Sequence, residues 1–215
     1  MALGINTIAE FNTVITMLGC LCASVQAATG IYAAFYKEKT ALLRTNEVLN
    51  RAHRAFGGFA TTLYFLGLFQ GLTGFIGGLL QIEGSPPFEP GKVTFNLHVW
   101  ISFPIMVIII WKTYISYFAK PKVFKQGKIL GMLTFIAWFI TWVTSCIAFY
   151  VNVEGNPWAT PGLAHETPGV LLPATWWGLI LQIFIPFVLA AMIAWPILWK
   201  GHKIEVEKEK KRQPQ

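Results

Sequence analysis

The stretch Asn50–Gly78, NRAHRAFGGFATTLYFLGLFQGLTGFIGG, begins with basic and polar residues and continues as an unbroken apolar segment rich in glycine. His53 stands where the first part changes into the second. A long apolar segment is typical of a helix that crosses a membrane, because about 20 residues span the hydrocarbon core of a bilayer. His53 is then either a metal ligand at the mouth of a membrane helix or part of a basic membrane edge.

The rest of the chain repeats this pattern. Of its 215 residues, 54% are hydrophobic and 13% are charged, whereas about 25% are charged in an average globular domain. The apolar residues lie in long blocks, and only α-helices satisfy their backbone groups at such spacing without a barrel partner. We therefore predict an all-α integral membrane protein, a five-transmembrane-helix bundle within residues 1–200. Its spans are expected at about 11–36, 55–80, 94–118, 128–151 and 173–199.

The basic residues predict the orientation of the bundle. Of the 17 lysines and arginines, all but Lys92 flank the same ends of these spans. The positive-inside rule makes that side cytoplasmic, which places the N-terminus outside and the C-terminus inside. Residues 201–215 are then a charged tail on the cytoplasmic side. The net charge of +7 is thus a topology signal, and the absence of a basic soluble face argues against nucleic-acid binding. The expected location is a prokaryotic plasma membrane or an energy-transducing organelle membrane.

The four histidines divide into two pairs by depth. His53 and His202 fall on the inner side, and His98 and His165 on the outer side. A helix rises about 1.5 Å per residue, so most of the bilayer separates His53 from His98, and these two cannot ligate one haem. The pairs His53 with His202 and His98 with His165 remain possible. Each histidine could instead be an ordinary interfacial or loop residue.

Small residues form a stripe below His53 on the second span. At 100° per residue, Gly57, Gly67 and Gly71 share its face. Such a face accommodates either a flat macrocycle or a closely packed helix, and the stripe alone favours helix packing.

His98 is the histidine that is hardest to explain without a function. The sequence FNLHVWISF places its imidazole among apolar residues at a helix mouth, and Lys112 lies on the same face of that span. Ionisable residues within a span usually face the bundle interior. We expect His98 to be a ligand or a functional hydrogen-bonding group.

The arrangement resembles the transmembrane b-type cytochromes, particularly five-helix di-haem subunits such as the gamma subunit of respiratory nitrate reductase. The similarity lies in the length, the five helices, the predicted orientation, and His53 and His202 on the second and fifth spans. Those subunits carry two histidines on each of these helices, whereas this chain has one on each. The opening HRAFG is also similar to haem helices of cytochrome b-type reductases.

The resemblance implies one or two haem b groups, held by one or two histidines each, that carry electrons between a quinone and a partner subunit. It also implies that basic groups near the inner face, Arg51, Arg54 and Lys112, interact with the propionates.

Two other classes of function compete with this interpretation. A non-catalytic subunit of a multi-subunit membrane complex is one, either purely structural or holding a chlorophyll-type pigment, because a single histidine can ligate its magnesium. A transporter or channel is disfavoured, since no carboxylate lies in the middle of a span. No soluble-enzyme motif is present. The chain is therefore at most an electron-transfer subunit of an oxidoreductase complex, with other subunits, the lipid bilayer and a quinone as expected partners.

Overall fold

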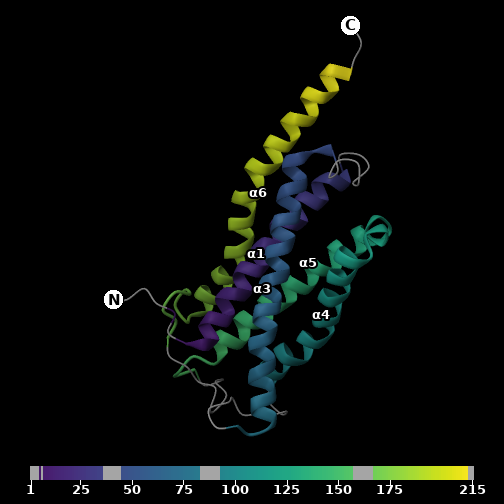
Figure 1. The fold of residues 1–215 in the computed structure, drawn as a ribbon. Coiled ribbons are helices and arrows are strands. Elements are labelled where there is room, and N and C mark those ends of the chain that lie inside the picture. The colour runs from purple at the N-terminus through teal and green to yellow at the C-terminus, as the bar shows by residue number, and fades with distance from the viewer. Residues whose placement is uncertain (1–4, 6, 36–44, 83–92, 157–166, 213–215) are drawn as a thin grey trace.

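The computed structural model describes residues 5, 7–35, 45–82, 93–156 and 167–212. Five helices account for most of them, and each is long and apolar enough to cross a membrane, which confirms the five-helix prediction. The side of the membrane that each end faces stays a prediction. The helices are α1 (Ile8–Phe35), α3 (Glu47–Leu79), α4 (Val93–Phe118), α5 (Lys120–Val151) and α6 (Trp176–Arg212) (Figure 1).

Helix α1 is the centre of the bundle and contacts α3, α5 and α6. Helix α4 packs mainly on α5, and it barely touches α3. Because successive helices run in opposite directions, the bundle has two ends. We call them the Glu10 end, where α1 starts, and the His53 end, where α3 starts.

The main core lies where α1, α3, α4 and α5 meet. It includes Tyr64, Trp138, Trp142 and the thiols of Cys20 and Cys146, consistent with cysteines that act as small core residues. The rings of Tyr64 and Trp138 meet edge to face with their centroids 5.7 Å apart. The Nε1 of Trp142 donates to the carbonyl of residue 183 at 3.0 Å and so ties α5 to α6.

Three helices extend beyond the predicted spans at the His53 end: α3, α6, and α5, which begins at Lys120 instead of position 128. Asn46 caps α3, since its Oδ1 accepts from the backbone N–H of Leu49, and this lets α3 begin eight residues before position 55. The Nδ2 of Asn46 donates to the carbonyl of Gly201 at 2.9 Å and to Glu205 at 3.1 Å. The predicted charged tail is therefore, as far as Arg212, a continuation of α6 that packs against the start of α3.

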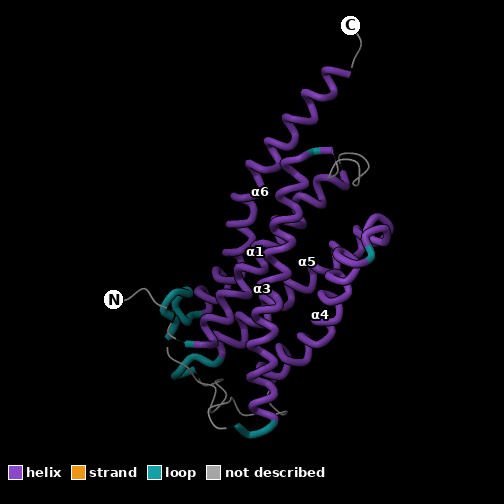
Figure 2. The backbone as a smooth tube through the Cα atoms, viewed as in Figure 1, coloured by secondary structure: helices purple, strands orange, loops and turns teal. Residues whose placement is uncertain are grey.

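At the Glu10 end, the connection between α5 and α6 is held by a buried carboxylate. Figure 2 shows the described part of this connection as a loop beside the start of α1. The Oε1 of Glu10 accepts the backbone N–H groups of Gly169, Val170 and Leu171 at 2.7–3.1 Å. Glu10 is fully buried, so these charge-assisted hydrogen bonds replace the water that its carboxylate loses.

Candidate cofactor pocket

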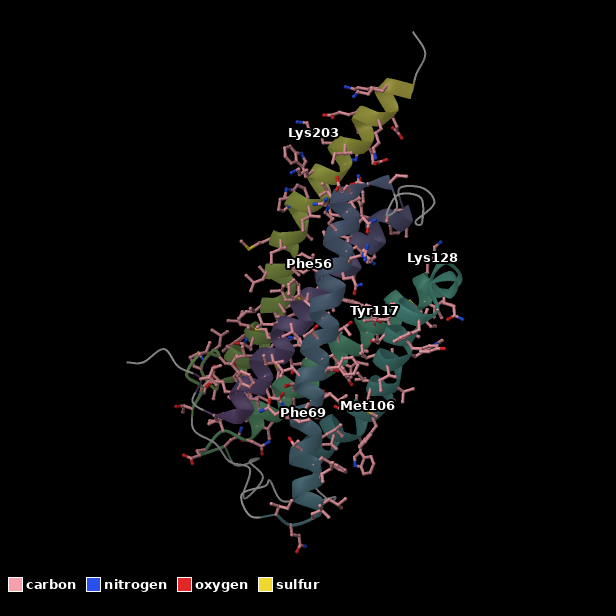
Figure 3. All side chains as sticks on the ribbon, in the orientation of Figure 1. Phe56, Phe69, Met106, Tyr117, Lys128 and Lys203 are labelled. Carbon is pink, nitrogen blue, oxygen red and sulfur yellow. The ribbon has the colours of Figure 1, made fainter. Side chains whose placement is uncertain are left out.

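A pocket lies between α3 and α4, which touch at few residues, among them Phe75 and Phe103, and residues of α1 and α5 close its back. Its cavity volume is about 110 Å³, and the open space at its mouth brings the total empty volume to about 750 Å³. Figure 3 labels Phe69 and Met106 on the two flanking helices, and Met106 belongs to the wall. The residues that line the pocket are mostly apolar: Asn12, Thr16, Leu63, Tyr64, Gly67, Leu68, Gly71, Leu72, Phe75, His98, Val99, Ser102, Phe103, Met106, Trp138 and Thr141.

Glycines leave part of the α3 side of this pocket without side chains. A Cβ added at Gly71 would meet no atom within 4 Å, and one at Gly67 would come no closer than 3.6 Å, to the Oδ1 of Asn12. The wall at Gly71 therefore faces open space that a side chain would fill. Further toward the His53 end, the same stripe packs on α1, because a Cβ at Gly57 would lie 2.2 Å from the Nε2 of Gln26. The stripe thus serves helix packing at one end and borders the pocket at the other.

Trp138 is one of the lining residues, and its indole nitrogen is buried. This Nε1 has no hydrogen-bond partner in the part of the chain that the structure describes. Buried donors are nearly always paired, so an unpaired one calls for an explanation.

His98 lines the pocket in a fixed orientation. Its Nδ1 lies 2.9 Å from the Oγ1 of Thr144 on α5. The Thr144 hydroxyl donates its single proton to the carbonyl of Ile140 at 2.8 Å, one turn earlier on α5. When the hydroxyl donates to this carbonyl, its oxygen accepts from the imidazole, and the ring proton then lies on Nδ1 and the lone pair on Nε2. A neutral imidazole with a free Nε2 and a hydrogen-bonded Nδ1–H is the form in which histidine ligates metals.

The histidines at the His53 end make a related arrangement. The Nδ1 of His53 lies 3.0 Å from the Oγ1 of Thr29, which donates to the carbonyl of Gln26 at 2.9 Å. The Nδ1 of His202 lies 2.9 Å from the phenol of Tyr32. The two histidines of the predicted inner pair, His53 and His202, are therefore hydrogen-bonded to residues of α1 that lie one turn apart.

The remaining predicted site residues lie as follows. Arg51 is exposed and pairs with Glu47 on its own helix, and Arg54 is also exposed. Lys112 is partly buried and donates to the Oε1 of Gln26 at 3.1 Å. His165, the predicted partner of His98, lies outside the described residues.

Sequence reasoning missed the groups that orient the imidazoles and hold the α5–α6 loop. Thr29 and Thr144 look like ordinary hydroxyls in apolar helices, and only the packing of α1 on α3 and of α4 on α5 pairs them with histidines. Glu10 did carry a signal, because an acidic residue at the start of an apolar span needs partners when it is buried.

No group of three His, Cys, Asp or Glu side chains within the described ranges could hold a bare metal ion. A metallated tetrapyrrole supplies four nitrogens itself and requires one or two from the protein, of which His98 could provide one. Comparison with protein-family models, with curated proteins and with solved structures finds no match to this chain.

Proposed function

We propose that this chain is a membrane subunit that binds haem b against His98 and carries electrons within a larger redox complex. The proposed substrate of that complex is a quinone. The observation that carries the proposal is the hydrogen bond from His98 to Thr144, because it leaves Nε2 as the ligating nitrogen at the wall of an apolar pocket. When bound, haem b would supply a one-electron couple.

The pocket supports a flat macrocycle for two reasons. The space at Gly71 is open, and the wall is mostly apolar. The apolar wall would exclude water and favour the neutral imidazole that ligation requires. Asn12, Thr16 and Thr141 add polar groups on α1 and α5 that could orient substituents of the ring.

A chlorophyll-type pigment is the second candidate. The described lining residues contain one imidazole, His98, and a single histidine suffices for a magnesium tetrapyrrole. In that case the chain would be a non-catalytic pigment-binding subunit.

The orientation belongs to the proposal as well. The described basic residues all lie toward the His53 end, at the start of α3, the end of α4, the start of α5 and the end of α6. This supports a cytoplasmic His53 end. The membrane that we propose is a prokaryotic plasma membrane or an energy-transducing organelle membrane.

An absorbance spectrum of the full chain, purified in detergent from cells that make tetrapyrroles, tests the proposal. We expect a reduced-minus-oxidised difference spectrum of haem b that His98→Ala removes and that His53→Ala leaves at full size if one haem is bound. Two bands that respond separately to the two variants would indicate a second haem at the His53 end. Helix content and gel-filtration profiles serve as controls for folding.

Far-red absorbance that depends on His98 would support the pigment instead. A colourless protein, or a haem band that survives His98→Ala unchanged, would overturn the proposed site.

A further inference from the structure

Lys112 is a cation within the membrane-spanning part of α4 that lacks a counter-charge among the described residues. Its partner there is the neutral amide of Gln26, whose Oε1 accepts at 3.1 Å. The ion pairs that the described residues form, Arg51 with Glu47 and Lys208 with Glu205, do not include it. An ammonium group has three N–H donors, so Lys112 can donate further hydrogen bonds besides the one to Gln26. Ionisable groups within a span commonly mark binding sites for this reason.

The position of the Gln26 amide is fixed by the neighbouring helix. Its Nε2 would lie 2.2 Å from a Cβ at Gly57, so the amide occupies space that the absent side chain leaves. Gln26 is on α1, Gly57 on α3 and Lys112 on α4, and the amide therefore joins three helices at one depth. Thr29, whose hydroxyl is hydrogen-bonded to His53, lies one turn further along α1. Lys112 is thus held at the junction of these helices.

The depth of Lys112 limits the kind of anion that can reach it. It lies six residues, about 9 Å, before the end of α4 at Phe118, and the same distance beyond Met106 in the pocket wall. A phospholipid phosphate stays in the head-group layer, outside the hydrocarbon core. The carboxylate of a single-chain lipid-soluble acid is smaller and can move below that layer.

We propose that Lys112 binds the carboxylate of a long-chain lipid-soluble acid, whose apolar chain lies between α3 and α4 toward the pocket. The charges are complementary, and the Lys112 ammonium forms a charge-assisted hydrogen bond with the carboxylate. Lys112 is 14 residues, about 21 Å along α4, from His98. The site is therefore separate from a metal held by His98 and does not rest on the proposed haem.

Quenching of tryptophan fluorescence by 9,10-dibromostearate measures this binding in the detergent-solubilised full chain. The uncharged methyl ester of the same acid is the matched ligand. We expect the acid to bind roughly tenfold more tightly than the ester, and Lys112→Gln to abolish that difference. Lys128→Gln removes the same charge from an exposed position near the start of α5 (Figure 3) and should preserve it.

A second variant tests the placement of the cation without removing it. Gly57→Ala forces the Gln26 amide away from α3 and should also reduce the preference for the acid, whereas Gly58→Ala, whose Cβ meets no atom within 4 Å, should not. Equal binding of acid and ester to the unaltered chain would overturn the proposal. So would an unchanged preference in Lys112→Gln, an equal loss in Lys128→Gln, or displacement of the acid by phosphatidylglycerol at equal concentration.

Discussion

The imidazole of His98 on α4 and the hydroxyl of Thr144 on α5 are 2.9 Å apart, and that hydroxyl also donates to the carbonyl of Ile140. When Thr144 donates to Ile140, these two contacts place the ring proton of His98 on Nδ1. His53 and Thr29 repeat this arrangement on α3 and α1 at the other end of the bundle. In both cases the helix hydroxyl orients an imidazole on a neighbouring helix.

Thr144→Val should weaken ligand binding at His98 by about 10- to 100-fold, because the imidazole loses the acceptor that fixes its orientation. The free energy of unfolding should fall by about 1 kcal/mol from the lost hydrogen bond. Titration of the purified chain with haemin, followed by absorbance, measures the affinity. Thr61→Val is the control, since the Thr61 hydroxyl bonds the carbonyl of Gly57 on its own helix. Equal effects of the two substitutions would contradict the orienting role.

Gly71→Leu should fill the pocket without disturbing the fold. No described atom lies within 4 Å of a Cβ at this position, so the unfolding free energy should change by less than about 0.5 kcal/mol. Ligand binding should fall at least roughly tenfold, because the new side chain occupies the space of the ring. Gly58→Leu on the same helix has equal room outside the pocket lining and should leave binding unchanged. Normal binding to the Gly71 variant would show that the ligand lies elsewhere.

Gly19→Ala should displace Trp138 from its place in the core. The added Cβ would lie 2.0 Å from the Trp138 ring, which is held against Tyr64. Overpacking of this kind costs about 1–3 kcal/mol of stability. Thermal unfolding followed by circular dichroism measures the loss, and Gly58→Ala provides a control with no such contact. An unchanged melting temperature in Gly19→Ala would show that α1 and α5 can separate at no cost.

Glu10→Gln should loosen the connection between α5 and α6. The amide cannot supply the charge that receives three backbone N–H groups, and we expect a loss of about 2 kcal/mol. Limited proteolysis should then cut near Gly169–Leu171 more rapidly. Glu47→Gln is the matched control, because its carboxylate is exposed and pairs with Arg51 at the surface, where ion pairs contribute little. If both variants are cut at the same rate, Glu10 does not hold the loop.

The sequence predicts the five helices because each apolar block is long enough to cross a bilayer by itself. The ends of the helices are harder to predict. Hydropathy predicts where a span leaves the lipid. Beyond that point α3 and α6 continue as helices through charged residues, and hydrogen bonds from Asn46 join the two extensions.

For the site, the sequence indicates Gly67 and Gly71 on the face of His53 and, separately, His98 on the next span, and the structure places these three residues in the lining of one pocket. Depth and helix faces follow from position along a regular helix, but they do not predict that α3 and α4 bring the glycines to His98, because that depends on tertiary packing. Thr144 and Trp138 could not be found in the same way, because their roles depend on how α5 is rotated against α4 and α1. The contact between Lys112 and Gln26 likewise depends on tertiary packing.

Helix α6 has 37 residues and is therefore about 55 Å long, nearly twice the thickness of the apolar layer. Its last turns must therefore extend into water beyond the apolar layer. The hydrogen bonds from Asn46 to Gly201 and Glu205 hold the start of this extension against α3. A domain or partner that attaches to the C-terminal end of α6 would be held at a constant distance from the lipid surface. A small tilt of α6 within the membrane would displace that end by a larger distance.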